Sequence, residues 1–235
     1  MLYNNIIIGN RYRKGRNMKI KKILGTWFEF EHHSTIEGTY WNQELYNFSE
    51  AEWRAKIDEI KDMGMEYIVL LATSLNNEAY FDTPIYPKSK HATTDLIKLL
   101  LDQAEKRNLK VFLSAGFYDN WRNPYHNMTN EGVTKRAFQA IKELHELFKT
   151  YQSFYGWYLP DETEISPYFH KAFVEYVNRY SDYIHSLDET KKVLIAPYGT
   201  RILKADDYFV EQLKNLKVDF IAYQDEVGVQ KNNRQ

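Results

Sequence analysis

Cysteine is absent from this chain, glycine and proline are few, and neither sign of charge dominates. The lack of cysteine excludes disulfide bonds, thiolate metal ligands and a cysteine nucleophile. The 31 Lys and Arg residues nearly balance the 32 Asp and Glu residues, so no net field favours nucleic acid or an anionic membrane as a partner. No apolar run approaches the roughly 18 residues of a membrane-spanning helix, and we predict none.

Aromatic residues are unusually abundant, with 19 Tyr, 13 Phe and 5 Trp in the chain. The content of 43% hydrophobic and 27% charged residues is typical of a folded protein rather than a disordered one. Because a single α/β barrel commonly has roughly 200 to 250 residues, a chain of 235 residues predicts one domain.

The N-terminal segment 1–20 differs from the rest of the chain, and we interpret it as an irregular leader. Its apolar run Ile6–Ile8 is short and precedes a basic segment. A secretory signal peptide has the opposite order and a longer apolar region. With Met18 as an alternative start, we expect a single barrel domain over 21–235. The localisation stays open: cytoplasmic as encoded, or secreted if the N-terminus is misassigned.

From Lys22 onward, short apolar segments alternate with amphipathic ones. Most of the apolar segments are nearly continuous, as expected for strands of a parallel sheet that is covered on both faces. The six predicted strands are Lys22–Phe30, Met65–Thr73, Leu109–Phe117, Phe154–Glu162, Lys191–Thr200 and Val218–Gln224.

Five helices are predicted between these strands. The first begins at Ser49, which forms a capping-box pattern with Glu52. The fourth begins at Ser166, with Pro167 at its first helical position. The other helices are predicted at about 95–108, at about 131–152 and from near Asp206 onward.

The alternation of strands and helices implies parallel strands with right-handed crossovers. Two folds fit this order: a doubly wound open sheet and a (β/α)8 TIM barrel. A doubly wound nucleotide-binding fold has a glycine-rich turn after an early strand. Here the first strand ends instead in the bulky and acidic segment Trp27–His32. We therefore predict an α/β fold of the TIM-barrel type.

The predicted barrel is incomplete, because about six strands and five helices fall short of the eight of each in a closed barrel. Two interpretations stay open. The chain is part of a longer barrel, truncated before strands 7 and 8, or it is a partial barrel. A last strand without a neighbour would be an open pairing edge.

The carboxyl ends of the strands, where TIM barrels carry their active sites, are rich in acidic and aromatic residues. In the strand 154–162, a period of two places Tyr158 and Glu162 on one face and Trp157 and Asp161 on the other. Burial among aromatic rings would raise the pKa of an inward Glu162, as a general acid requires. Alternatively, both acids only stabilise the N-terminus of the next helix.

The segment Gly156–Glu162, Gly-Trp-Tyr-Leu-Pro-Asp-Glu, resembles the fourth-strand signature of retaining glycoside-hydrolase barrels. With the strand ending Ile221–Asp225, it makes residues from about Lys22 to Gly228 similar to an uncharacterised glycoside-hydrolase-like TIM-barrel family, a domain of unknown function. The resemblance implies a carbohydrate substrate and makes Glu162 the acid/base. It also puts Asp161 in place of the family's Asn, and the nucleophilic Glu of the seventh strand has no counterpart among the predicted strands.

Glycoside hydrolysis needs a second carboxyl group, roughly 5–5.5 Å from the first for retention and roughly 6.5–9.5 Å for inversion. The candidates are Asp225, Glu226 and Glu29. Asp225 is preferred as the second catalytic residue because it directly follows a strand, although it could equally cap a turn. Glu29 could instead bind a sugar hydroxyl group or pair with an arginine such as Arg122.

Sugar rings pack their C–H groups on flat aromatic side chains, while their hydroxyl groups need polar partners. Tyr and Trp also serve as core residues, so a core role stays open for each aromatic candidate. The predicted substrate-binding residues are Trp27, Glu29, Tyr118, Trp121, Trp157, Tyr158, Tyr198 and Gln224.

Three functions fit these features. The first is a glycoside hydrolase that uses carboxylate acid/base catalysis without a cofactor. The second is a carbohydrate-binding or inactive barrel that lacks a complete catalytic pair. The third, a sugar isomerase-like or metal-dependent barrel, needs carboxylate and histidine ligands together. We predict no metal site, because His32 and His33 are adjacent on an extended segment and would point in opposite directions. The oligomeric state stays open.

Overall fold

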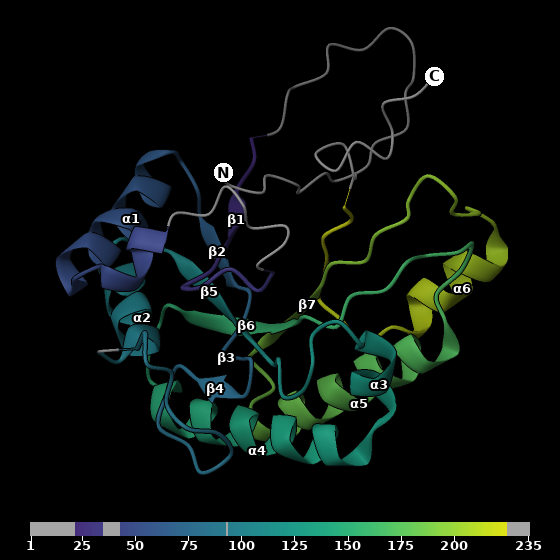
Figure 1. Ribbon diagram of the computed structural model, residues 1–235. Coiled ribbons are helices and arrows are strands. Elements are labelled where there is room, and N and C mark those ends of the chain that lie inside the picture. The colour runs from purple at the N-terminus through teal and green to yellow at the C-terminus, as the bar shows by residue number, and fades with distance from the viewer. Residues whose placement is uncertain (1–21, 35–42, 93, 225–235) are drawn as a thin grey trace, which may run out of the picture.

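The computed structural model describes residues 22–34, 43–92 and 94–224. Their main feature is a curled sheet of six parallel strands in the order β1-β2-β5-β6-β7-β8 (Figure 1). All six predicted strands are confirmed, each somewhat shorter than expected. They are β1 Gly25–Phe28, β2 Tyr67–Leu70, β5 Lys110–Ser114, β6 Phe154–Leu159, β7 Lys192–Ile195 and β8 Phe220–Ile221.

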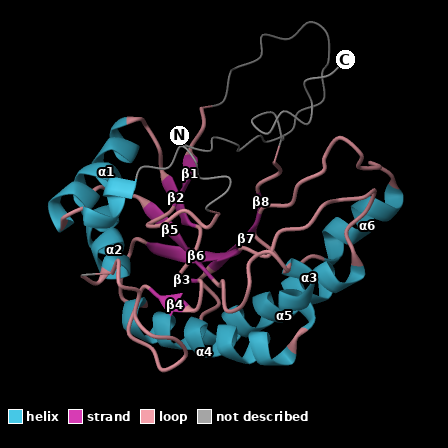
Figure 2. Cartoon of the chain, viewed as in Figure 1, coloured by secondary structure: helices cyan, strands magenta, loops and turns pink. Residues whose placement is uncertain are grey.

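Helices cover the outer, convex side of this sheet, from α1 at one end to α6 at the other (Figure 2). This arrangement confirms an incomplete TIM-barrel-like fold. None of the helices in the described part is long and apolar enough to cross a membrane. The helices are η1 Gln43–Asn47, α1 Glu50–Asp62, α2 Leu96–Lys106, α3 Pro124–Thr129, α4 Glu131–Phe148, α5 Lys171–Leu187 and α6 Asp207–Asn215.

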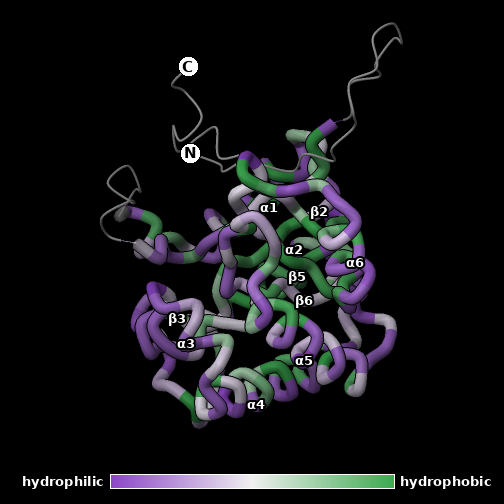
Figure 3. Tube along the Cα trace, turned by 90° about the vertical axis from the view of Figure 1, so that its right-hand side faces the viewer, coloured by the Kyte–Doolittle hydropathy of each residue, from purple (hydrophilic) through white to green (hydrophobic). Residues whose placement is uncertain are grey.

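Hydrophobic residues gather along the strands and the inner faces of the helices (Figure 3). The larger core lies between the sheet and the helices and contains Trp157 and Leu159. A smaller one lies on the concave side of the sheet and contains Phe112 and Tyr158. Side chains of β6 therefore alternate between the two sides, as predicted.

A close approach of two backbones holds β6 beside β7. A Cβ atom at Gly156 would lie 2.1 Å from the carbonyl oxygen of Lys192. Any side chain at this position would separate the two strands, so the position requires glycine. Glycine at position 156 therefore fixes the position of β6, and with it the position of Glu162 just beyond the strand.

Two helix starts show how local signals compare with tertiary contacts. The capping box of Ser49 and Glu52 is confirmed at the start of α1. The prediction that Ser166 caps the fourth helix is wrong, because α5 begins at Lys171 and the side chain of His170 caps it. Backbone hydrogen bonds from Ile165 N to Tyr198 O and from Tyr198 N to Thr163 O keep this segment extended.

Three short elements near the carboxyl ends of the strands were not predicted. Helix α3 begins at Pro124 and is capped by Asn123. The strands β3 Ser74–Leu75 and β4 Glu78–Ala79 form a hairpin. Its turn residues Asn76 and Asn77 have φ values of 52° and 62°, which asparagine tolerates better than most residues.

Candidate active site

Glu162 lies just beyond β6, on the concave side of the sheet. The hydroxyl group of Tyr158 donates a hydrogen bond to Glu162 Oε1, and Gln224 Nε2 donates one to Oε2. Gln224 also donates to the carbonyl oxygen of Ala196 at 2.8 Å, which holds the amide in place. Burial raises the pKa of Glu162 to about 7, although these hydrogen bonds and His33 act in the opposite direction. A proton is therefore available on this carboxyl group near neutrality.

Asp161 points the other way, into the packing between the sheet and the helices. Its Oδ1 accepts a hydrogen bond of 2.7 Å from Asn127 Nδ2 on α3. Burial raises the pKa of Asp161 to about 7, and the hydrogen bond from Asn127 lowers it in part. Because α5 begins only at Lys171, neither acid lies in the first turn of that helix.

Three of the predicted substrate-binding residues lie at or next to Glu162: Tyr158 and Gln224 contact it, and Trp27 packs against Tyr158. The rings of Trp27 and Tyr158 meet edge to face at 5.8 Å and 83°. Tyr158 is fully buried, whereas Trp27 and Gln224 are partly exposed. These residues form an aromatic and amide shell around the carboxyl group.

The other predicted aromatic residues lie at different depths. Trp157 is 1% exposed and packs in the outer core against Phe154. Tyr118 is also buried, with its hydroxyl group 3.0 Å from Thr73 Oγ1. Neither ring is accessible to a ligand, so both residues have a core role. Tyr198 is partly exposed on the segment that pairs with Thr163 and Ile165.

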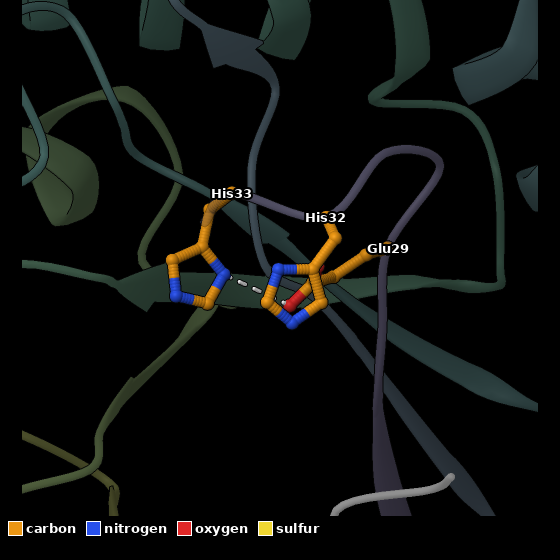
Figure 4. Close-up of side chains that lie close together, drawn as sticks. All are labelled: Glu29, His32 and His33. Atoms are coloured by element: carbon orange, nitrogen blue, oxygen red, sulfur yellow. Dashed lines mark hydrogen bonds and ion pairs between the residues drawn. The ribbon is translucent and has the colours of Figure 1, made fainter. Parts of the chain in front are cut away.

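Glu29 forms a cluster with His32 and His33 (Figure 4). His33 Nδ1 lies 3.2 Å from Glu29 Oε1. The two imidazole rings stack at 4.7 Å with an angle of 15° between their planes. The prediction that the two histidines point in opposite directions is wrong, because the chain bends after Phe30 and brings both rings beside Glu29.

This cluster has the donor types of a metal site, one carboxylate and two imidazoles. One ligand atom from each residue lies within 4.8 Å of the others. Its geometry does not fit chelation. The nitrogen lone pairs lie in the planes of two nearly parallel rings, so they do not converge on one point. The backbone N–H of Ser34 also donates to His32 Nδ1, which favours the tautomer protonated on Nε2. The cluster fits hydrogen bonding to a polar ligand better than metal binding.

A cavity of about 370 Å³ opens next to this cluster. Trp121 forms its aromatic wall and meets His33 edge to face at 4.7 Å. The guanidinium group of Arg122 lies 5.2 Å from the centre of the Trp121 ring. The lining residues are His33, Asn76, Asn77, Asp119, Asn120, Trp121 and Arg122.

Two of the amides that line this cavity, Asn76 and Asn77, come from the unpredicted hairpin. The pair Asn76 and Asn77 could have indicated this turn from the sequence, because consecutive asparagines are typical of tight hairpin turns. Asp225, predicted as the second catalytic acid, and Glu226 lie outside the described residues. The structure therefore brings together Glu162, Trp27, Tyr158 and Gln224, whereas Glu29 and Trp121 gather around His33, which lowers the pKa of Glu162 electrostatically.

The family of this chain follows from comparison with known proteins. Residues 23–235 match the family described as "Domain of unknown function (DUF4434)". This chain belongs to the DUF4434 family. The match confirms the predicted resemblance to an uncharacterised family with a glycoside-hydrolase-like barrel. Among curated proteins, none matches this DUF4434 chain.

Solved structures similar to the DUF4434 chain include glycoside hydrolases. A "putative alpha-L-fucosidase" from Bacteroides thetaiotaomicron has a TM-score of 0.65 at 16% identity, over 91% of this chain and 70% of that one. A family 2 glycosyl hydrolase from Bacteroides cellulosilyticus has a TM-score of 0.51 at 13% identity, over 89% of this chain and 22% of that one. A β-1,4-D-mannanase from Cryptopygus antarcticus reaches 0.47 at 15% identity, over 73% and 54%. At these identities the similarity shows the fold alone.

Proposed function

We propose that this DUF4434 protein is a glycoside hydrolase and that Glu162 is its general acid. The observation that carries the proposal is the position of Glu162, inward at the carboxyl end of a central strand, with a pKa of about 7. A carboxyl group that keeps its proton near neutrality can protonate the leaving oxygen of a glycosidic bond. The glycosidase names of similarly folded proteins support this reaction class by analogy of fold.

In this proposal the shell around Glu162 controls its proton. Tyr158 and Gln224 each donate a hydrogen bond to the carboxylate and so stabilise the ionised form. Burial favours the protonated form more strongly. When Glu162 donates its proton to the glycosidic oxygen, the bond from that oxygen to the anomeric carbon breaks, and either water or the carboxylate of the second acid bonds to that carbon. The same two hydrogen bonds then stabilise the carboxylate that forms.

The sugar would lie in the cavity beside Trp121. The partly exposed indole ring of Trp121 offers a surface for the C–H groups of a sugar ring, and the amides of Asn76 and Asn77 offer partners for hydroxyl groups. Glu29 lies behind this wall, where its carboxylate contacts the lining residue His33 at 3.2 Å. The second catalytic acid stays, in our proposal, Asp225.

The test uses a series of aryl glycosides of the same sugar, with leaving groups of increasing pKa. A sugar is first chosen by screening wild-type protein. Replacing Glu162 with Gln should reduce kcat/KM for phenyl glycosides by about 100-fold or more. The loss should be much smaller for dinitrophenyl glycosides, because a good leaving group needs little protonation. Asp161→Asn is the matched control, because Asp161 faces the helices rather than the concave side.

Two results would contradict the assignment of Glu162. One is equal turnover by wild type and Glu162→Gln, and the other is a loss that does not depend on the leaving group. Binding of a glycan without turnover by either protein would select the alternative function, a carbohydrate-binding barrel. The cavity beside Trp121 favours that alternative as well, since stacking and amide contacts require no catalytic pair.

A further inference from the structure

A second hollow, of about 570 Å³, lies beside the segment that follows Glu162 and takes no part in the proposed catalysis. Three regions of the chain meet there: the start of α3, the segment before α5 and the first turn of α6. Tyr125 and Tyr208, which line it, are 61% and 59% exposed. Most large aromatic side chains in the described residues are buried, so two such tyrosines at one hollow need an explanation.

Hydrogen bonds and ring contacts hold several aromatic residues of this hollow in place. The hydroxyl group of Tyr168 donates a hydrogen bond to Asp206, the N-cap of α6. Its ring meets Tyr208 edge to face at 4.7 Å. The backbone of Phe169 exchanges two hydrogen bonds with the side-chain amide of Gln212, at 3.0 and 2.9 Å. A ligand that packs on these rings would therefore find them already positioned.

The charged groups of the lining have partners of opposite sign. Lys171 Nζ lies 3.3 Å from Glu175 Oε1, and Glu164 Oε1 lies 3.7 Å from Arg201 Nη2. The hollow thus offers no excess charge to attract an ionic ligand. Thr163, Ser166 and His170 supply polar groups around its edge.

We propose that this hollow is an accessory binding site for the neutral sugar units of a glycan chain. Exposed flat rings with polar groups at their edges match the alternating C–H and hydroxyl surface of a neutral sugar. Thr163, which lines the hollow, follows Glu162 directly in the sequence. The inference shares with the proposed function only the class of ligand, and it requires no hydrolysis.

Affinity electrophoresis in native gels tests this site with three neutral polysaccharides, galactomannan, xyloglucan and arabinoxylan, and with anionic polygalacturonate. At least one neutral polysaccharide should retard the wild-type protein. Tyr125→Ala and Tyr208→Ala should each weaken that affinity about five- to tenfold. Tyr208→Phe keeps the ring and should bind like wild type. Leu147→Ala, at a 54% exposed position on α4, controls for the loss of any exposed side chain.

The proposal is overturned if no neutral polysaccharide retards the protein, or if only polygalacturonate does. It is also overturned if the tyrosine variants keep wild-type affinity while their thermal midpoints show that they are folded. Sedimentation tests whether a second copy of the chain covers the hollow instead. A wild-type dimer that Tyr208→Ala dissociates would show this and would contradict the proposal. Retardation that the tyrosine variants weaken supports the accessory site whether or not the protein hydrolyses a glycan, because the gel measures binding alone.

Discussion

Tyr158 and Glu162 lie four residues apart and meet through a hydrogen bond from the tyrosine hydroxyl group to the carboxylate. Tyr158 is fully buried beneath the carboxyl group and faces the same side of the sheet. Its hydrogen bond lowers the pKa of Glu162, whereas burial raises it, and burial dominates. The pKa of about 7 is thus a balance that single substitutions can shift.

The pH profile of hydrolysis should report this balance. A general acid must be protonated, so kcat/KM should fall as the pH rises through about 7. Tyr158→Phe removes a hydrogen bond that stabilises the carboxylate, so it should raise the pKa of Glu162 and move this fall to higher pH. Tyr180→Phe, at a buried tyrosine in the outer core, should leave the profile unchanged. A shift to lower pH in Tyr158→Phe would contradict the assignment.

Stability should also depend on pH through Asp161. Its folded-state pKa of about 7 lies above the ordinary value of 3.8, so the folded protein binds the proton more tightly than the unfolded chain. The stabilisation is complete below the unfolded pKa and is lost as the pH rises toward about 7. Urea unfolding of Asp161→Asn between pH 4 and 8 should show a weaker decline, by about 1 kcal/mol per pH unit at most. A decline as steep as that of wild type would contradict this account.

Substitutions of Trp121 and Trp157 should have different effects, the first on ligand binding and the second on stability. Trp121 lines the cavity and is partly exposed, so Trp121→Ala should raise KM or the Kd for a glycan several-fold with little effect on folding. Trp157 is buried, and Trp157→Ala should lower the free energy of unfolding by about 3–5 kcal/mol. Kinetics and urea unfolding of both variants check this division. Equal effects of the two substitutions on binding would show that the cavity is not the ligand site.

Metal removal should leave the protein unchanged. The nearly parallel rings of His32 and His33 do not direct their lone pairs to one point beside Glu29. Treatment with EDTA should therefore preserve activity, and added Zn²⁺ should not raise the thermal midpoint. Calorimetric titration with Zn²⁺ gives an independent measure. Tight binding that His33→Ala removes would show that the cluster rearranges into a metal site.

The approach of β6 to β7 gives a prediction about the fold. Gly156→Ala should destabilise the protein by about 1–3 kcal/mol or more, because the new methyl group meets the backbone of Lys192. Gly132→Ala is the matched comparison: its Cβ would lie 3.1 Å from the side chain of Asn130 rather than from a backbone, so the cost should be smaller. Thermal unfolding of both variants measures the difference, and equal stability of the two would contradict the steric argument.

The sequence alone determined the six strands, because short and nearly continuous apolar runs that alternate with amphipathic helices are typical of a parallel sheet covered on both faces. It also determined which face of β6 carries Glu162, since alternate side chains of a strand must point to opposite sides. Capping at Ser49 was also predictable from the sequence, because its hydrogen bonds join residues that lie within four positions of one another.

Only the tertiary structure decided what lies around those residues. The start of α5 depends on the backbone pairing of Thr163 and Ile165 with Tyr198, which lies more than thirty residues further along the chain than either of them. The meeting of His32, His33 and Glu29 depends on a bend that no periodicity marks, and Trp121 reaches His33 from the loop after another strand. A local pattern specifies a cap because its hydrogen bonds join near neighbours, and it indicates a strand because the apolar run itself is local. Contacts between distant loops depend on how the sheet curls, and the sequence contains no short-range signal for them.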